Sequence, residues 1–169
     1  MSKFKIRPAT PADAQAINDI YNHYVRGSTA TFDTEEISLP RRHSWLEEHG
    51  GQHPVLVAED DAGDVVAWGS LSQWRERSAW SRTVEISIYV AAKATGRGAG
   101  PALCVALLGE AKRLGHHAVV SQIVHENEPS LKMAARQGFE RVGTLKEVGR
   151  KFDRWLDVVL MEFVIPEGE

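Results

Sequence analysis

Residues 83–103, TVEISIYV-AAKATGRGAG-PAL, decide the architecture of this chain. From Thr83 to Val90 apolar and polar residues alternate, which is typical of a strand. The glycine-rich segment after it carries Lys93 and Arg97, and Pro101 suits a first helical turn because its missing N–H would have no partner there. Strand, glycine loop and helix N-terminus in series offer free amides and a positive dipole end to a ligand. The order predicts an anion site, most simply one for phosphate.

Three glycine-loop systems could produce such a site. A kinase-type P-loop needs Lys-Ser/Thr after its last glycine, and Gly100 is followed by Pro-Ala. The dinucleotide fingerprint needs a third glycine where Pro101 or Leu103 stands. The pyrophosphate loop of acyl-CoA-dependent N-acyltransferases, Arg/Gln-x-x-Gly-x-Gly/Ala, matches at Gly98 and Gly100 and departs at Thr95. A glycine-rich loop is also compatible with a plain tight turn.

Composition narrows the class of protein. The chain has 169 residues, 43% hydrophobic and 25% charged, which predicts one globular domain over 1–169. A net charge of -3 argues against an electrostatic nucleic-acid binder. The single cysteine, Cys104, excludes an internal disulfide and fits a reducing compartment, so we expect a cytoplasmic protein. No segment has the pattern of a membrane span or signal peptide. No histidine pattern shows metal-ligand spacing, so we expect no metal.

Periodicity predicts the order β-α-α-β-β-β-α-β-α-β-β. A first helix opens at Thr10-Pro-Ala-Asp13, where Thr10 is the N-cap and Asp13 completes a capping box. The predicted strands are 4–8, 55–59, 65–74, 83–90, 118–124, 139–148 and 155–164, and the further helices are 39–48, 101–115 and 127–137. The last two strands enclose a long turn with Arg150, Lys151, Phe152 and Arg154. We therefore expect an α/β (α+β) fold: a mixed, largely antiparallel sheet of about six to seven strands, with about four helices on both faces.

With the glycine loop, this order resembles the GNAT superfamily of acetyl-CoA-dependent N-acetyltransferases. More narrowly, the chain is similar to the phosphinothricin and methionine sulfoximine N-acetyltransferases from about Ile6 to Met161. The most specific piece is Lys-Phe-x-Arg-Trp-x-Asp at 151–157, which GNAT proteins in general lack. The other stretches that carry the resemblance are Tyr21-Asn22, Thr31-Phe32, Thr34-Glu35, Trp74-Arg75, Thr83-Val84-Glu85, Tyr89-Val90, Asn127, Ser130, Gly138-Phe139, Gly143 and Val148-Gly149.

Acetyl transfer from a thioester to an amine needs a base, since a free α-amino group is mostly ammonium at neutral pH. Glu85 is the candidate: a charged residue on an otherwise alternating strand just before the phosphate loop. It could act directly or through a water, and a solvent-facing glutamate is the alternative. By family analogy, a backbone N–H near Val90 would stabilise the oxyanion.

The resemblance implies acetyl-CoA as cosubstrate. It places the cofactor against Ile88, Tyr89, Val90, Arg97, Gly98, Ala99, Gly100, Asn127 and Ser130. Asn127 is equally suited to be a helix N-cap.

The proton donor to the thiolate stays open. The family often has a histidine where this chain has Ala134, and Tyr89 could donate instead or be a core tyrosine. Cys104 fits a buried helix position, so we expect direct transfer without an acyl-enzyme.

The acceptor site is predicted in the connection before Glu85. A guanidinium holds a carboxylate or phosphinate through two hydrogen bonds, and either Arg75 or Arg77 could do so. Phe32 and Trp80 would wall the site or belong to the core. The resemblance puts Lys151 where the site closes near a homodimer contact, although a solvated turn lysine is the alternative.

The expected function is acetylation of the α-amino group of a small acceptor of the phosphinothricin, methionine sulfoximine or methionine sulfone type. One alternative is a non-catalytic CoA-binding sensing module, which Glu85 argues against and Ala134 mildly favours. Another is acetylation of a peptide N-terminus or a polyamine. A polyamine site should be acidic, whereas the connection before Glu85 is basic.

Overall fold

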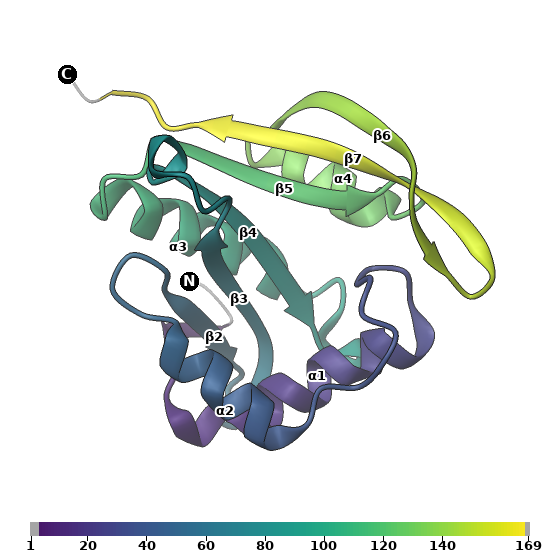
Figure 1. Cartoon of the computed structure of the whole chain (residues 1–169). Coiled ribbons are helices and arrows are strands. Elements are labelled where there is room, and N and C mark those ends of the chain that lie inside the picture. Colours follow the sequence, from purple (N-terminus) through teal and green to yellow (C-terminus); the bar gives the residue numbers. More distant parts are fainter. Residues whose placement is uncertain (1–3, 168–169) are drawn as a thin grey trace.

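The computed structural model describes residues 4–167, which form a seven-stranded sheet in the order β1-β2-β3-β4-β5-β7-β6 (Figure 1). The strands are β1 (Lys5–Pro8), β2 (Val55–Glu59), β3 (Val65–Gln73), β4 (Thr83–Val90), β5 (Ala118–Val124), β6 (Glu140–Lys151) and β7 (Arg154–Val164). The helices are α1 (Ala14–Gly27), α2 (Leu39–Glu48), α3 (Ala99–Arg113) and α4 (Glu128–Arg136), with short 3-10 turns at Pro11–Asp13, Ser78–Trp80 and Ala92–Ala94. Within the described residues only β4 and β5 pair in parallel. The mixed, largely antiparallel sheet is confirmed.

Helices cover both faces of the sheet: α1 and α2 lie on one side of β2–β4 and α3 on the other (Figure 1). Side chains alternate along β4. Val84 and Ile86 join the core under α3, which includes the fully buried Leu107. Tyr89 packs in the second core, under α1 and α2. Glu85 precedes Tyr89 by four residues on the same strand, so its side chain points to the same face of the sheet, the one that α1 and α2 cover.

The sheet opens between β4 and β5. The two strands pair only from Thr83–Ala118 to Glu85–Val120. Beyond that point β4 continues along β3 and β5 continues along β7, and the two arrows separate in Figure 1. The second half of β4 therefore has a strand neighbour on one side only.

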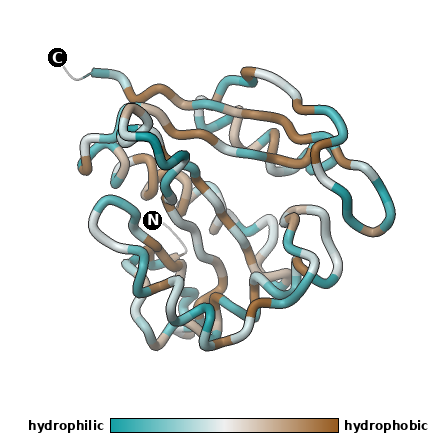
Figure 2. The backbone as a smooth tube through the Cα atoms, viewed as in Figure 1, coloured by the Kyte–Doolittle hydropathy of each residue, from teal (hydrophilic) through white to brown (hydrophobic). Residues whose placement is uncertain are grey.

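Hydrophobic residues gather along the paired strands, and hydrophilic ones at the exposed connections (Figure 2). In the described chain no helix is both long and apolar enough to cross a bilayer.

The capping box predicted at the start of the first helix is present. The Asp13 carboxylate accepts the Thr10 backbone N–H at 2.7 Å.

The predicted long turn between the last two strands is wrong. β6 runs on to Lys151 and β7 starts at Arg154, so only Phe152 and Asp153 connect them. Both have positive φ, 50° and 57°, as a two-residue type I′ hairpin requires. The usual signal for that turn is Asn-Gly, and Phe-Asp does not provide it. The start of α3 also differs: it is Ala99, not Pro101.

Candidate active site

The glycine loop has the backbone that an anion site needs. Gly96 and Gly98 have φ of 76° and 98°, a region that side chains disfavour, and Gly98 is the N-cap of α3. Gly100 packs closely against α4 instead, because a Cβ there would lie 3.2 Å from the Met133 sulfur and that side chain would have to shift. The amides of Ala99 and Gly100 belong to the first turn and have no intrahelical acceptor.

Two more amides face the opening between β4 and β5. The Ala91 N–H donates to the Val66 carbonyl of β3 at 2.8 Å. Successive residues of a strand direct their N–H groups to opposite sides. The amides of Ile88 and Val90 therefore point away from β3, to the side that β5 has left. The Val90 carbonyl, on that same side, accepts the Tyr24 hydroxyl at 2.5 Å.

Glu85 lies at the last paired position, where β4 and β5 separate. Its side chain is half-buried, and Gln122 of β5 donates to Oε1 at 3.1 Å. Burial raises the pKa of Glu85, while the Gln122 hydrogen bond acts in the opposite direction. A carboxylate with a raised pKa is a better base than a free glutamate. Nothing in the sequence pointed to Gln122 beyond its polarity in an apolar strand.

Tyr89 is part of an aromatic cluster on the α1/α2 face. Its ring centroid lies 5.0 Å from that of Tyr21 and 5.1 Å from that of Trp68. Burial raises the pKa of Tyr89, so its phenol keeps its proton at neutral pH. Burial and the hydrogen bond to Asp33 raise the pKa of Tyr21 to about 12.

The segment between α1 and α2 is tied to the β6–β7 hairpin. The Lys151 ammonium donates to the Thr31 carbonyl at 2.8 Å, and the Thr31 hydroxyl bonds the Tyr21 hydroxyl at 2.7 Å. Lys151 is only 5% exposed, and burial lowers its pKa. It is therefore not a solvated turn lysine.

A second tie joins the same segment to the β5–α4 connection. Arg154 donates two hydrogen bonds to the Glu126 carboxylate, at 2.9 and 3.0 Å, and the Thr29 hydroxyl donates to it at 2.7 Å. The hydrogen bonds from Arg154, and to a lesser extent that from Thr29, lower the pKa of Glu126 to about 2. Three segments distant in sequence meet at this carboxylate.

Phe32 lies on the backbone of β6. A Cβ built on Gly149 would come within 2.1 Å of the Phe32 ring, so the ring occupies the space that any side chain at 149 would need. Phe32 is 39% exposed and thus lies at the surface rather than in the core.

The predicted acceptor arginines lie in the exposed connection between β3 and β4. The Arg75 guanidinium is 5.1 Å from the Trp74 ring and 6.0 Å from the Trp80 ring. Arg77 makes neither contact, and neither arginine forms an ion pair within residues 4–167. Both guanidiniums are therefore available to an acid group.

The remaining candidates lie around α3 and α4. Asn127 caps α4 by accepting the Ser130 N–H at 3.3 Å, and Arg97 is exposed on the glycine loop. Ala134 is buried in the core. Burial also raises the pKa of Cys104 to about 12, which disfavours a thiolate. No cluster of three metal-ligating side chains occurs in the part of the chain that the structure describes.

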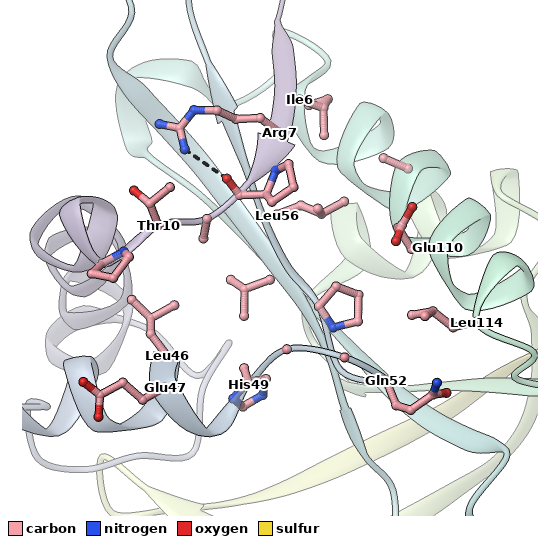
Figure 3. Close-up of a pocket in the computed structure, with 18 of the residues that line it drawn as sticks. Ile6, Arg7, Thr10, Leu46, Glu47, His49, Gln52, Leu56, Glu110 and Leu114 are labelled. Atoms are coloured by element: carbon pink, nitrogen blue, oxygen red, sulfur yellow. Dashed lines mark hydrogen bonds between the residues drawn. The ribbon is translucent and has the colours of Figure 1, made fainter.

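One hollow lies away from these residues. It measures about 960 Å³ and lies between α2, the β1 edge and the end of α3, with Arg7, His49 and Glu110 on its walls (Figure 3). None of the predicted site residues lines it. A smaller cavity of about 210 Å³ adjoins Glu85, because Ser72, its cross-strand partner, and Ser87, two residues further along β4, both line it.

The comparisons with known proteins decide the family. Residues 6–160 match the acetyltransferase (GNAT) domain. The chain belongs to the GNAT family of acetyltransferases. A phosphinothricin N-acetyltransferase from Streptomyces coelicolor is 37% identical over 95% of this chain and 96% of its own. An L-methionine sulfoximine/L-methionine sulfone acetyltransferase from Pseudomonas paraeruginosa is 38% identical over 93% and 92%.

Solved structures of GNAT proteins agree. A phosphinothricin acetyltransferase from Sinorhizobium meliloti in complex with acetyl-CoA superimposes with a TM-score of 0.94 at 32% identity, covering 98% of this chain and 90% of that one. A ribosomal-protein-alanine N-acetyltransferase from Brucella melitensis superimposes with a TM-score of 0.93 at 39% identity, covering 95% of this chain and 99% of that one. This chain is thus an acetyl-CoA-dependent GNAT N-acetyltransferase related to the phosphinothricin acetyltransferases.

Replacing Gly149 by alanine tests the contact between Phe32 and β6. The new methyl group must displace the ring, and forced overpacking costs about 1–3 kcal/mol of unfolding free energy. Gly143→Ala is the matched control on the same strand, since no atom lies within 4 Å of its added Cβ. Urea unfolding measures both variants, and equal free energies for the two would contradict the contact.

Proposed function

We propose that this enzyme transfers the acetyl group of acetyl-CoA directly to the α-amino group of a small amino-acid-like acceptor. The acceptor class is that of phosphinothricin, methionine sulfoximine and methionine sulfone. The observation that carries the proposal is the position of Glu85 at the fork of β4 and β5, beside amides without strand partners. A base for the amine and donors for the carbonyl oxygen thus lie along the same opening of the sheet.

The cosubstrate would follow the opening of the sheet. Its pyrophosphate would rest on the amides of residues 96–100, where the N-terminus of α3 favours negative charge. Its arm would lie between β4 and β5, near Asn127 and Ser130. The thioester carbonyl would accept the Val90 N–H, which stabilises the charge that develops on this oxygen.

The proton steps fall to Glu85 and Tyr89. Glu85 would take a proton from the acceptor ammonium, directly or through a water. Tyr89 is available to protonate the departing thiolate, since its phenol stays protonated at neutral pH. An acyl-enzyme on Cys104 is disfavoured, because that thiol is 2% exposed and its pKa is raised to about 12.

The acceptor would bind between the Lys151–Thr31 contact and the Arg154–Glu126 contact. Arg75 or Arg77 would hold its carboxylate, and Phe32, Trp80 and Lys151 would border the site. Acetylation of a peptide N-terminus is the second candidate, since the Brucella melitensis relative is named for a ribosomal-protein alanine. The basic connection favours an acceptor with a free carboxylate next to its amine.

The β6–β7 hairpin supports a homodimer. β6 is the outer strand of the sheet, and Val142, Val148 and Trp155 are 55%, 53% and 61% exposed. Exposed apolar residues on an edge strand mark an association surface.

Sedimentation velocity tests the dimer. We expect twice the chain mass of 18.7 kDa for the wild type and the chain mass for Trp155→Glu. Val105→Glu, at a residue of α3 that is 60% exposed, should leave the dimer intact. A wild type that sediments as a monomer at micromolar concentration refutes this surface.

Glu85→Gln tests the base. Loss of a general base should lower turnover by about a hundredfold or more, with unchanged affinity for acetyl-CoA. In the wild type, turnover should fall as the pH drops below the raised pKa of Glu85, and the variant should lack this limb. Glu140→Gln, at an exposed residue of β6, is the control. Near-wild-type turnover of Glu85→Gln at all pH values would make Glu85 structural.

Arginine-to-lysine variants at positions 75 and 77 identify the carboxylate contact. A paired charge-assisted contact is worth about 1.5–3 kcal/mol, or roughly ten- to hundredfold in kcat/KM. Lysine cannot reproduce the fork, so one variant should raise KM by this factor. Esterifying the acceptor should cost the wild type a similar factor and that variant little. Equal acetylation of ester and acid by the wild type would exclude carboxylate recognition here.

A further inference from the structure

Two hydrogen bonds fix the ring of His49 between α2 and β3. His49 is the C-cap of α2, and its Nδ1 lies 2.8 Å from the Trp45 carbonyl oxygen. Its Nε2 lies 3.0 Å from the hydroxyl of Ser72 on β3. A carbonyl can only accept, so Nδ1 carries the proton and donates. Burial lowers the pKa of His49, so the ring is neutral at pH 7 and Nε2 is an acceptor.

The tautomer of His49 determines what the Ser72 hydroxyl can do. Because Nε2 accepts, the single hydroxyl proton of Ser72 is donated to His49. The hydroxyl oxygen keeps its lone pairs, and among the described residues it has no further partner. Ser72 is half-buried and lines the 210 Å³ cavity. Toward this cavity the hydroxyl is therefore an acceptor only.

Ser72 lies directly opposite Glu85 on the adjacent strand. Opposite residues of an antiparallel pair point to the same face and have Cβ atoms about 4.5–5.5 Å apart. One water molecule can therefore donate to both the Ser72 oxygen and the Glu85 carboxylate. Both of its hydrogens are then used, and its lone pairs point away from both residues. A water held in this way is oriented to receive a proton from the cavity and to pass one to Glu85.

The cavity extends from Glu85 toward the proposed position of the thioester. Ser72 lines it at the level of Glu85, and Tyr89, the residue before Val90, lines it as well. Glu85 and Val90 are five residues apart, which is about 16 Å along a strand. An amine that attacks a thioester at the Val90 amide is therefore beyond the reach of the Glu85 side chain. Water in the cavity can join them.

The size and polarity of this cavity suit water. Its volume of about 210 Å³ is several times the ~30 Å³ that one water molecule occupies in the liquid. Polar and charged side chains share the wall with Ser72, and they are Asp33, Arg41, Arg42, Ser70 and Ser87. Polar cavities of this size hold ordered water, whereas apolar cavities stay dry.

We propose that this cavity carries the water through which Glu85 takes the acceptor's proton, and that Ser72 and His49 are positioning residues for that water. His49 takes the only proton of the Ser72 hydroxyl, and Ser72 accepts from the water nearest Glu85. Each water on the route receives one proton and gives one. The ammonium becomes a neutral amine, Glu85 becomes protonated and no water is consumed. The inference rests on the proposed acetylation of an amine and selects the route through water.

Ser72→Ala removes the acceptor that orients the water. One hydrogen bond of this kind is worth about two- to tenfold, so the single-turnover rate of acetyl transfer to methionine sulfone should fall by this factor. The affinities for acetyl-CoA and methionine sulfone should stay the same, because Ser72 contacts the water alone. Ser72→Thr keeps a hydroxyl and should keep most of the rate. Ser44→Ala, at an exposed serine of α2, is the control.

His49→Phe keeps an aromatic ring and removes both ring nitrogens. The Ser72 hydroxyl proton can then turn toward the water, so the rate should fall by a similar factor. The double variant of His49→Phe and Ser72→Ala should be no slower than Ser72→Ala, because His49 acts through Ser72. A glutamine amide can donate to the Trp45 carbonyl and accept from Ser72, so His49→Gln should keep most of the rate. His43→Gln, at a half-buried residue of the same helix, is the control.

Two further readouts do not need turnover. Nitrogen NMR of the imidazole at neutral pH should show His49 as the Nδ1–H tautomer. A crystal structure of the wild type should contain a water within hydrogen-bond distance of both the Ser72 hydroxyl and the Glu85 carboxylate, and the structure of Ser72→Ala should lack it.

The outcomes separate this inference from the proposed function. A wild-type rate in Ser72→Ala, losses that multiply in the double variant, or an Nε2–H tautomer of His49 would overturn the inference and leave the proposed acetylation intact. If the wild type acetylates neither methionine sulfone nor phosphinothricin but its crystal structure holds the water on Ser72 and Glu85, the proposed acceptor class falls and the water route stands.

Discussion

The rest of the site depends on how little β4 and β5 pair. Parallel strands normally satisfy each other's backbone along their length, yet here pairing stops at Glu85 and Val120. The divergence leaves the Ile88 and Val90 amides facing an opening, and it places Glu85 at the base of that opening. The same strand then leads into the glycine loop and α3. A backbone feature thus places Glu85, the Ile88 and Val90 amides and the glycine loop along one opening.

The second constraint is the set of contacts that distant segments make beside the α1–α2 connection. Lys151 and Arg154 flank a two-residue turn, and they bind Thr31 and Glu126 on two other connections. Phe32 fills the space above Gly149. The hairpin motif at 151–157 therefore holds the α1–α2 segment against the β6–β7 hairpin. In physical terms, a buried hydrogen bond from Lys151 and an exposed ion pair from Arg154 connect these segments.

Most of the fold was predictable because local signals agreed with it. Alternation in β4, the capping box at Thr10 and the glycines before α3 each determine local structure through nearest neighbours. The turn at Phe152-Asp153 could not be predicted from the sequence. Its positive φ values are imposed by the pairing of β6 and β7 and not by residue type. Arg42 was equally hidden, because only tertiary packing brings a polar residue of an ordinary helix against Tyr21, Trp45 and Trp68. The roles of Glu85, Arg75 and Arg77 stay predictions.

The central claim is that the opening between β4 and β5 receives acetyl-CoA, and amide NMR spectra recorded during a titration with it test this most directly. We predict that the largest shifts, and protection from hydrogen exchange, occur at the amides of Ile88, Val90, Ala99 and Gly100. Shifts confined to the walls of the 960 Å³ hollow, around Arg7, His49 and Glu110, would contradict the account, because the ligand would then bind at the β1 edge of the sheet.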